Sequence, residues 1–276
     1  MASATSWAPL NLHLDTGKNY SRNGYGDYST VKAFEILKEY LESNGSKHRA
    51  YSQLSSMFPK DRPTNLAARI EVDDAQEMLG CLILEVAEQI PFSHPAQMAL
   101  AKLFALLRDS PRFRMLIDGY QFHQYCALKC TYMKLRRPDS ALNAVAFQAR
   151  LTALGAVDNR SYMIFSIAQT LEQDQPNRPD SVLGVELARC AVWILCSGLQ
   201  AYHTVVLYPP DLTPRLERVW GCGAMYNGPI FGLDRWSFWR SRLLAYVDDL
   251  RISQEHREMC LDAALMMDAF KRSVKW

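Results

Sequence analysis

The chain has 276 residues, of which 49% are hydrophobic and 22% are charged, as is typical of a globular protein with a sizeable core. Its formal net charge of +2 gives no electrostatic footprint for nucleic acid, so generic DNA or RNA binding is not predicted. Seven cysteines, scattered mostly through apolar segments, argue against a disulfide framework and favour reduced thiols in an intracellular protein.

The first 28 residues lack the basic start and the continuous apolar run of a secretory signal, which favours a cytoplasmic location. They are polar and rich in glycine and tyrosine, so we expect residues 1–28 to form a loosely held arm. The remainder, residues 29–276, is predicted to form a single helical domain, because apolar residues recur there at helical rather than alternating spacing.

The predicted helices begin with one capped by Ser29 and ended by Gly45, and a polar loop follows. The positions of this first helix that we expect to be buried share one face: Val31, Phe34, Leu37 and Leu41. Further helices are predicted over about 73–90, from a Ser93 cap with Pro95 in the first turn, and from Pro111 to about residue 135. Residues 142–154 and 162–173 form a helical pair.

An uncharged segment, residues 190–210, is nearly long enough to span a bilayer. It carries Ser197, Gln200 and His203, however, so we predict a buried core helix and no membrane span.

Thr213 and Pro214 open a short helix that reaches Trp220. After a glycine-rich stretch, Asp234 is the predicted cap of a helix bearing Trp236, Trp239, Leu243, Val247 and Leu250. Ser253 caps a last helix with Met259, Ala263, Met266 and Phe270 inside. The predicted fold is all-α, a single multi-helix domain of nine or ten helices.

One acidic motif, DDAQE over residues 73–77, resembles the aspartate-rich segment that holds magnesium and diphosphate in class I terpene cyclases. Asp73, Asp74 and Glu77 would supply oxygen ligands from neighbouring positions of a helix. A capping role for Asp73 with Gln76 in a first helical turn is the favoured alternative. The second metal motif of such enzymes is incomplete, because Arg257 stands where a glutamate is required after Asp249 and Ser253.

Other signatures of catalysis or metal binding are weak or absent. His123, Cys126 and Cys130 share one helix face, but without paired short spacings they are better explained as buried side chains than as zinc ligands. The chain has no phosphate-binding loop, dinucleotide fingerprint or nucleophile elbow. We therefore predict no metal and no cofactor.

The densest feature is the stretch GAMYNGPIFGLDRWSFWRSRLL, residues 223–244, where tight backbone is surrounded by large aromatic side chains. As the wall of a pocket, these aromatic residues would contact a substrate: Trp220, Tyr226, Phe231, Trp236 and Trp239. Tyr202, His203 and Arg235 are the candidate catalytic donors. In the alternative, the tryptophans fill the core, while Arg235 and Arg240 pair with Asp248, Asp249 or Glu217 at the surface.

Several blocks together resemble a helical family of filamentous fungi, domain of unknown function 3632: SHPAQMALAKLFALL, ALNAVAFQARLTAL, IAQTLEQD, ARCAVWILCSGLQAY and AMYNGPIFGLDRWSFWRSRL. The resemblance covers roughly residues 80–272 and leaves out the N-terminal arm. Gln169 departs from it, where an arginine often precedes the Leu-Glu pair, and Ser140 or Ala141 stands in place of a tryptophan. It implies an all-helical cytosolic protein without established activity, similar in some cases to products of secondary-metabolite gene clusters.

The leading functional hypothesis is a cofactor-free cyclase or isomerase, of Diels–Alder type for example, that holds an apolar polyketide or terpenoid in its reactive conformer. Such a reaction needs no nucleophile, which agrees with the missing signatures. The alternatives are a non-catalytic helical binding or scaffold protein and the metal-dependent terpene cyclase. The sequence leaves open whether the chain forms a homo-oligomer.

Overall fold

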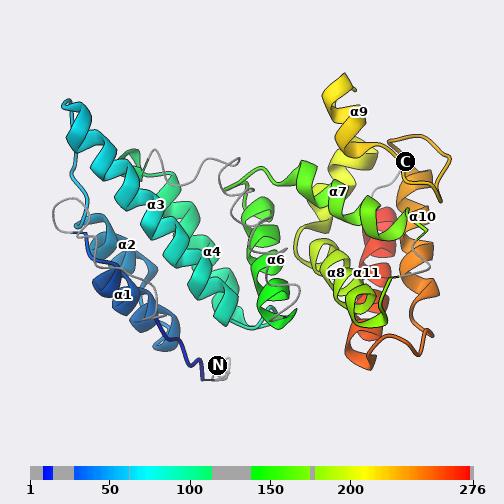
Figure 1. Cartoon of the computed structure of the whole chain (residues 1–276), viewed down its shortest axis with the longest axis horizontal. Helices are drawn as coiled ribbons and strands as arrows, with labels where there is room; N and C mark the ends of the chain where they lie inside the picture. The colour runs from blue at the N-terminus through cyan, green and yellow to red at the C-terminus, as the bar shows by residue number, and fades with distance from the viewer. Residues whose placement is uncertain (1–8, 15–27, 62, 114–137, 175–177, 274–276) are drawn as a thin grey trace. The chain divides into compact units, whose positions relative to one another are not determined.

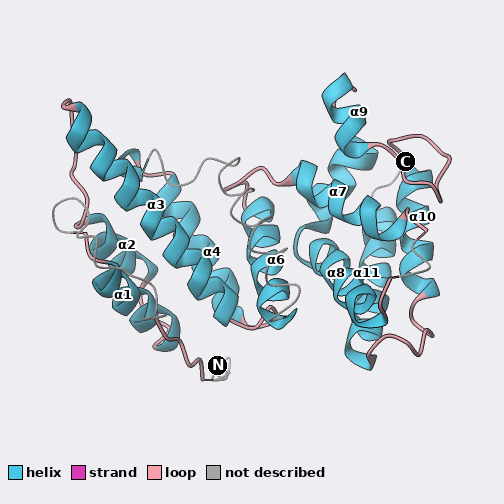
Figure 2. Cartoon of the chain, viewed as in Figure 1, coloured by secondary structure: helices cyan, strands magenta, loops and turns pink. Residues whose placement is uncertain are grey.

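The computed structural model describes residues 9–14, 28–61, 63–113, 138–174 and 178–273 (Figure 1). Every regular element among these residues is a helix, which confirms the predicted all-α class (Figure 2). The chain divides into two compact units, the first comprising residues 1–130 and 139–147 and the second residues 131–138 and 148–276. Each unit is described by itself, and the predicted single domain over 29–276 stays a prediction.

The helices of the first unit are α1 (Thr30–Glu42), α2 (Lys47–Ser55), α3 (Leu66–Gln89), α4 (Pro95–Arg108), the short 3-10 helix η1 (Pro111–Phe113) and the beginning of α6 (Pro138–Ala153). Helix α1 has the predicted start, since the Ser29 side chain accepts a hydrogen bond from Lys32 N. It ends where Asn44 takes a positive φ of 50° and Gly45 N donates to Tyr40 O at 2.9 Å.

Four details of the first unit differ from the sequence-based prediction. Helix α2 occupies part of the expected polar loop, and α3 begins at Leu66, before the expected start near residue 73. The cap of α4 is His94, whose Nδ1 accepts from Ala96 N at 3.1 Å, in place of Ser93. Val31, expected inside, is 55% exposed, because Ala33, Phe34, Ile36 and Leu37 form the buried face of α1.

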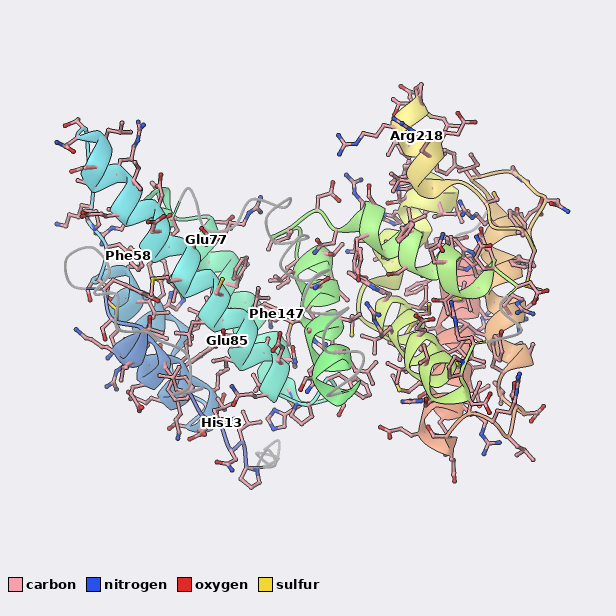
Figure 3. The ribbon with its side chains drawn as sticks, in the orientation of Figure 1. His13, Phe58, Glu77, Glu85, Phe147 and Arg218 are labelled. Carbon is pink, nitrogen blue, oxygen red and sulfur yellow. The ribbon has the colours of Figure 1, made fainter. Side chains whose placement is uncertain are left out.

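The predicted N-terminal arm is described over residues 9–14, and this part is docked on the first unit. Leu12 is 1% exposed, and the main chain of His13 is hydrogen-bonded to the side chain of Gln89 at the end of α3. Figure 3 shows His13 near the C-terminal end of α3, where Gln89 lies. Of the helix predicted from Pro111, residues 111–113 are described and the rest lies outside the described residues.

The helices of the second unit are the end of α6, α7 (Arg160–Leu171), α8 (Asp180–Tyr202), the π-helix η2 (His203–Leu207), α9 (Pro214–Trp220), α10 (Leu233–Ala245) and α11 (Gln254–Ser273). Helix α8 packs against α7 and α11, and α10 packs against α11 (Figure 1). The predicted caps of α9 and α11 are confirmed, because Thr213 Oγ1 accepts from Leu216 N and Ser253 Oγ from His256 N.

Helix α8 with η2 is the one apolar stretch among the described residues that is long enough to cross a membrane, with a mean hydropathy of 1.7 in its most apolar window. Of that window, 67% is buried within the protein, as expected for a core helix and compatible with a soluble protein. The backbone leaves helical geometry at Ser197 (φ −141°, ψ 20°), whose hydroxyl donates to Trp193 O at 2.9 Å.

Two helices of the second unit differ in detail from expectation. Helix α10 follows Gly232, which has a φ of 120°, and ends at Ala245, so Asp234 lies in its first turn and Leu250, expected inside, is 85% exposed. In α11, Met267 is buried, whereas Met266, expected inside, lies at the surface. A shift of one position at the end of a helix is enough to move a side chain to another face.

A glycine allows α8 and α11 to approach closely. A Cβ atom at Gly198 would lie 2.7 Å from Cε2 of Phe270. We expect Gly198→Val to lower the free energy of unfolding by about 1–3 kcal/mol, because the larger side chain overpacks this contact. Urea unfolding followed by circular dichroism measures the change. Ala269→Val, on the exposed side of α11, is the control, and an equal loss in both variants would contradict the predicted contact.

Candidate functional site

The candidate site lies where the glycine-rich loop, residues 221–232, folds against the end of α7. Glu172 is the C-terminal cap of α7 and is fully buried. A carboxylate at the negative end of a helix dipole is unfavourable unless cations stand beside it. Two arginines of α10 do so: Arg235 pairs with the Glu172 carboxylate, and Arg242 Nε donates to Leu171 O at 3.2 Å.

Arg235 is 0% exposed, and each of its five N–H groups has an acceptor within the protein. Nε and Nη2 donate to the two carboxylate oxygens of Glu172, at 2.6 and 3.1 Å. The other bonds go to main-chain oxygens at both ends of the loop, at distances of 2.7, 2.9 and 3.3 Å: those of Trp220, Ile230 and Gly221. One guanidinium therefore holds both ends of the loop to α7.

The Glu172 carboxylate is equally saturated. Oε1 accepts from Trp239 Nε1 at 2.5 Å in addition to Arg235, and Oε2 accepts from Gly223 N at 2.7 Å. The main-chain oxygen of Glu172 accepts from Met225 N at 2.8 Å. Four side-chain bonds and one main-chain bond thus converge on this residue from α10 and from the loop.

Gly223 is required at the closest approach of the loop to α7. A Cβ atom at this position would lie 2.4 Å from the main-chain oxygen of Glu172. Because that obstacle is backbone, a side chain at position 223 would displace the loop. The glycine, the ion pair and the bond from Trp239 therefore form one unit, which we call the Glu172–Arg235 clasp.

The clasp determines the shape of the loop more than the stability of the protein. Burying an ion pair costs several kcal/mol in desolvation of the two charges. Proteins in which such a pair is replaced by well-packed apolar side chains are often as stable as the original, or more stable by roughly 1–4 kcal/mol. What an apolar pair cannot supply is a set of directed bonds to the loop carbonyls. We infer that the clasp is an architectural feature that holds an irregular loop in one conformation.

Three of the predicted site residues pack against one another in the core. Tyr202 and Trp239 are 0% exposed and Trp236 is 1% exposed. The Tyr202 ring lies 5.1 Å from that of Trp236 in an edge-on arrangement, and the Trp236 and Trp239 rings are 6.3 Å apart. Trp236 Nε1 donates to Met267 O at 3.3 Å. The Arg235 guanidinium lies over the Trp239 ring, 5.1 Å from its centroid.

The other predicted site residues belong to the loop and its edges. The rings of Trp220 and Phe231 meet edge-on at 5.8 Å. Tyr226 is buried, donates from its hydroxyl to Pro229 O at 3.2 Å, and packs on Phe238; burial raises its pKa to about 12. These contacts reinforce the fold of the loop.

His203 lies apart from this cluster, at the surface. It begins the π-helix η2, and its ring meets that of the exposed Tyr208 at 5.7 Å. The same π-helix holds the far end of the loop, because Gly232 N donates to Val205 O at 2.7 Å. Of the three candidate catalytic residues, Tyr202 is therefore buried and His203 exposed, while Arg235 has no N–H group left for a substrate.

Two polar atoms of the predicted aromatic site residues, the Tyr202 hydroxyl and Trp220 Nε1, are buried without a hydrogen-bond partner. The Tyr202 hydroxyl is buried and lacks a hydrogen bond, although its ring contacts Trp236 and Phe270. Burial raises the pKa of this phenol, so it remains a protonated donor at neutral pH. A buried hydroxyl without a partner calls for an explanation, and a ligand that accepts its hydrogen bond is one.

The surface ion pairs predicted for the two arginines are not the ones observed. Arg235 pairs with the buried Glu172, and Arg240 pairs with Asp268 of α11 at 2.6 Å. Glu172 itself was missed as a site residue, since nothing local distinguishes it from any other glutamate at the end of a helix. Its partners lie 63 and 67 residues further along the chain.

The acidic motif lies within α3, well past its first turn, so the predicted capping role of Asp73 is wrong. Gln76 instead donates from Nε2 to Arg112 O at 2.7 Å.

The incomplete second metal motif includes Asp249. Both Nε and Nη2 of Arg251 donate to the Asp249 carboxylate, which lowers the pKa of Asp249. His123, Cys126 and Cys130 lie outside the described residues. Within the described ranges no group of three His, Cys, Asp or Glu side chains is placed to hold a metal ion.

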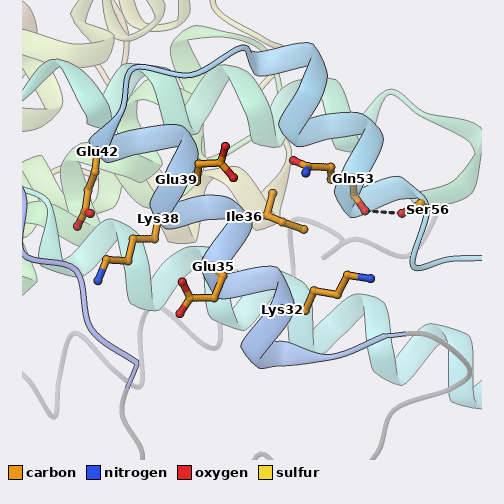
Figure 4. Close-up of a pocket in the computed structure, with 8 residues that line it drawn as sticks. All are labelled: Lys32, Glu35, Ile36, Lys38, Glu39, Glu42, Gln53 and Ser56. Carbon is orange, nitrogen blue, oxygen red and sulfur yellow. Dashed lines mark hydrogen bonds between the residues drawn. The ribbon is translucent and has the colours of Figure 1, made fainter.

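The first unit carries an open groove of about 660 Å³ beside α1 and α2 (Figure 4). Its lining is mostly charged or polar: Lys32, Glu35, Ile36, Lys38, Glu39, Glu42, Gln53 and Ser56. It carries charges of both signs, and Glu39 is paired with Arg49 at 3.3 Å. Nothing in this lining provides a nucleophile activated by a neighbouring base.

A family model described as a protein of unknown function (DUF3632) matches residues 81–243, a range that includes Glu172, Gly223, Arg235 and Trp239. This confirms the resemblance predicted from the sequence blocks. No curated protein and no solved structure matches the chain.

The clasp predicts different outcomes for single and double substitutions. We expect Glu172→Gln to lower the free energy of unfolding by about 3–5 kcal/mol, because the buried Arg235 loses its counter-charge. Glu172→Leu combined with Arg235→Met should recover most of that loss. The glycine-rich loop of this double variant should nevertheless be cleaved by a protease within residues 224–229, since the hydrogen bonds from Arg235 to the main-chain oxygens of the loop are lost. Urea unfolding and limited proteolysis measure the two effects; a double variant with an intact, protected loop would contradict the role of the clasp.

Proposed function

We propose that this chain, which belongs to the family of proteins of unknown function DUF3632, is a non-catalytic binding protein whose recognition surface is the outer face of the glycine-rich loop. The observation that carries the proposal is the saturation of Arg235 and Glu172. Every hydrogen-bonding position of both side chains is used within the protein, so Arg235 has no N–H group left to act as the predicted catalytic donor.

The outer face of the loop is exposed and chemically mixed. Ala224, Met225, Asn227, Gly228 and Pro229 are turned to solvent, and Met225 is 37% exposed. A methionine beside the amide side chain of Asn227 is suited to contact another protein, since thioether side chains adapt to apolar partners. We therefore propose that the loop binds a protein partner. A second copy of this chain would count as such a partner.

The rigidity of the loop supports this proposal. A loop that is already ordered loses little conformational entropy on binding, so affinity is gained without new contacts. Loops held by a rigid helical frame are where binding residues concentrate. On this account the clasp keeps the free loop in its bound conformation.

Site-specific crosslinking tests the proposal. We expect a photo-crosslinking amino acid placed at position 225 to give a discrete crosslinked protein in cell extract, and Glu172→Gln in the same chain to abolish it because the loop loses its shape. The matched control carries the crosslinker at position 250, which is 85% exposed and distant in sequence. Equal labelling from both positions, or a product that survives Glu172→Gln, would overturn the assignment of the loop.

A second candidate function is the cofactor-free cyclase or isomerase acting on an apolar polyketide or terpenoid. The unpartnered hydroxyl of Tyr202 supports it, because a carbonyl oxygen of a bound substrate would satisfy this donor and be polarised by it. Trp236 and Phe270 would provide the apolar surroundings. The site would have to open, since Tyr202 is fully buried in the described conformation. A cytoplasmic location is part of both proposals.

Tyr202→Phe separates the two candidates. Without a ligand we expect this variant to be as stable as the wild type or more stable by about 1 kcal/mol, because it removes an unsatisfied buried hydroxyl. Thermal unfolding against apolar polyketides and terpenoids, with and without magnesium, is the measurement. A metal-independent rise of the melting temperature that Tyr202→Phe abolishes supports the cyclase; no rise with any compound removes it.

A further inference from the structure

Residues 9–14, PLNLHL, have an alternating rather than helical pattern. Leucines stand at positions 10, 12 and 14, with Asn11 and His13 between them. Burial alternates in step: the leucines are buried or half-buried, whereas Asn11 and His13 are exposed. This two-residue period is the signature of an extended segment that lies with one face against a surface.

Side chains of two helices hold the main chain of this segment. Gln89, the last residue of α3, accepts from His13 N with Oε1 and donates with Nε2 to His13 O, both at 2.9 Å. Glu42, the last residue of α1, accepts from Leu12 N at 3.3 Å. The amide of Gln89 thus reproduces the paired bonds that a neighbouring β-strand would offer.

The central leucine supplies the apolar part of the contact. Leu12 is 1% exposed, as deeply buried as the core residues of the first unit. Burying a leucine side chain contributes about 1.5–3 kcal/mol. Main-chain bonds that any sequence can make, together with a position that accepts one apolar side chain, are the two elements by which proteins recognise extended peptides.

We propose that Glu42, Gln89 and the buried position filled by Leu12 form a binding site for an extended peptide of a partner protein, with leucines at alternate positions, and that residues 9–14 occupy this site in cis. The partner segment replaces the chain's own segment and makes the same bonds. The proposal goes beyond the glycine-rich loop and is independent of it, because it uses other residues, all in the first unit.

The site adjoins a charged groove. Glu42 also lines the groove beside α1, which contains Glu35 and Glu39 together with Lys32 and Lys38 (Figure 4). A peptide that extends from the site along this groove meets charges of both signs.

A segment tethered in cis competes at a high effective concentration, in the millimolar range for short flexible connections. The wild-type chain should accordingly bind an added peptide weakly, and a chain whose own segment cannot dock should bind it well. Leu12→Asp creates such a chain, because a carboxylate cannot occupy the buried position without a large desolvation cost. Asn11→Asp is the matched control, since it introduces the same carboxylate at the exposed neighbouring position and should leave the segment docked.

The experiment uses the full-length chain and a fluorescein-labelled peptide of sequence APLNLHLD, with fluorescence polarisation as the readout. We expect Leu12→Asp to bind this peptide at least about tenfold more tightly than the wild type or Asn11→Asp. The gain should be lost when Gln89→Ala is added, and also when the central leucine of the peptide is replaced by aspartate. Leu12→Ala, a milder release of the segment, provides a second chain should Leu12→Asp fail to fold.

Three results would overturn the proposal. Absence of peptide binding to folded Leu12→Asp or Leu12→Ala would show that the position does not accept a segment in trans. Binding that is unaffected by Gln89→Ala would place the peptide elsewhere. A wild-type chain that forms a concentration-dependent dimer, which Leu12→Asp abolishes, would identify the partner segment as that of a second copy instead of another protein.

Discussion

The conformation of the glycine-rich loop in the second unit depends on one buried ion pair. Glu172 ends α7, Arg235 lies in the first turn of α10, and the twelve-residue segment that precedes α10 is folded around their contact. Neither charge reaches water, so each must be satisfied by the protein, and the available partners are the carbonyls and the amide of the loop itself. The cost of burying two charges thereby fixes the conformation of a segment that has no regular secondary structure of its own.

The same physical solution occurs in the first unit on a smaller scale. There an extended segment, residues 9–14, is held by the side chains of Gln89 and Glu42 rather than by a neighbouring strand. Both irregular segments present main-chain groups to side chains of helices, and both leave a face toward solvent. A helical frame that orders irregular segments in this way is suited to recognition, since it places residues without covering them. This is the reason for preferring a binding function over catalysis at the clasp.

Local patterns in the sequence predicted most of the helices, because caps and apolar periodicity act over a few residues: Ser29, Thr213 and Ser253 all cap the helices they were expected to cap. Helix α2 escaped prediction since it buries only Ala50, Leu54 and Ser55, too few residues for a periodic pattern. At the candidate site, the aromatic stretch was recognised, but its purpose depends on a glutamate 63 residues away from Arg235. No single sequence indicates which distant charge a buried arginine will meet.

Hydrogen–deuterium exchange of the native protein, measured amide by amide, tests the central claim most directly. If the clasp holds the loop in one conformation, the amides of Gly223, Met225 and Gly232, which are bonded to Glu172 and Val205, will exchange about as slowly as the core of α8. They will then open only with the second unit as a whole. Exchange of these three amides within seconds, while α8 stays protected, would show that the loop opens independently of the ion pair and would contradict the account.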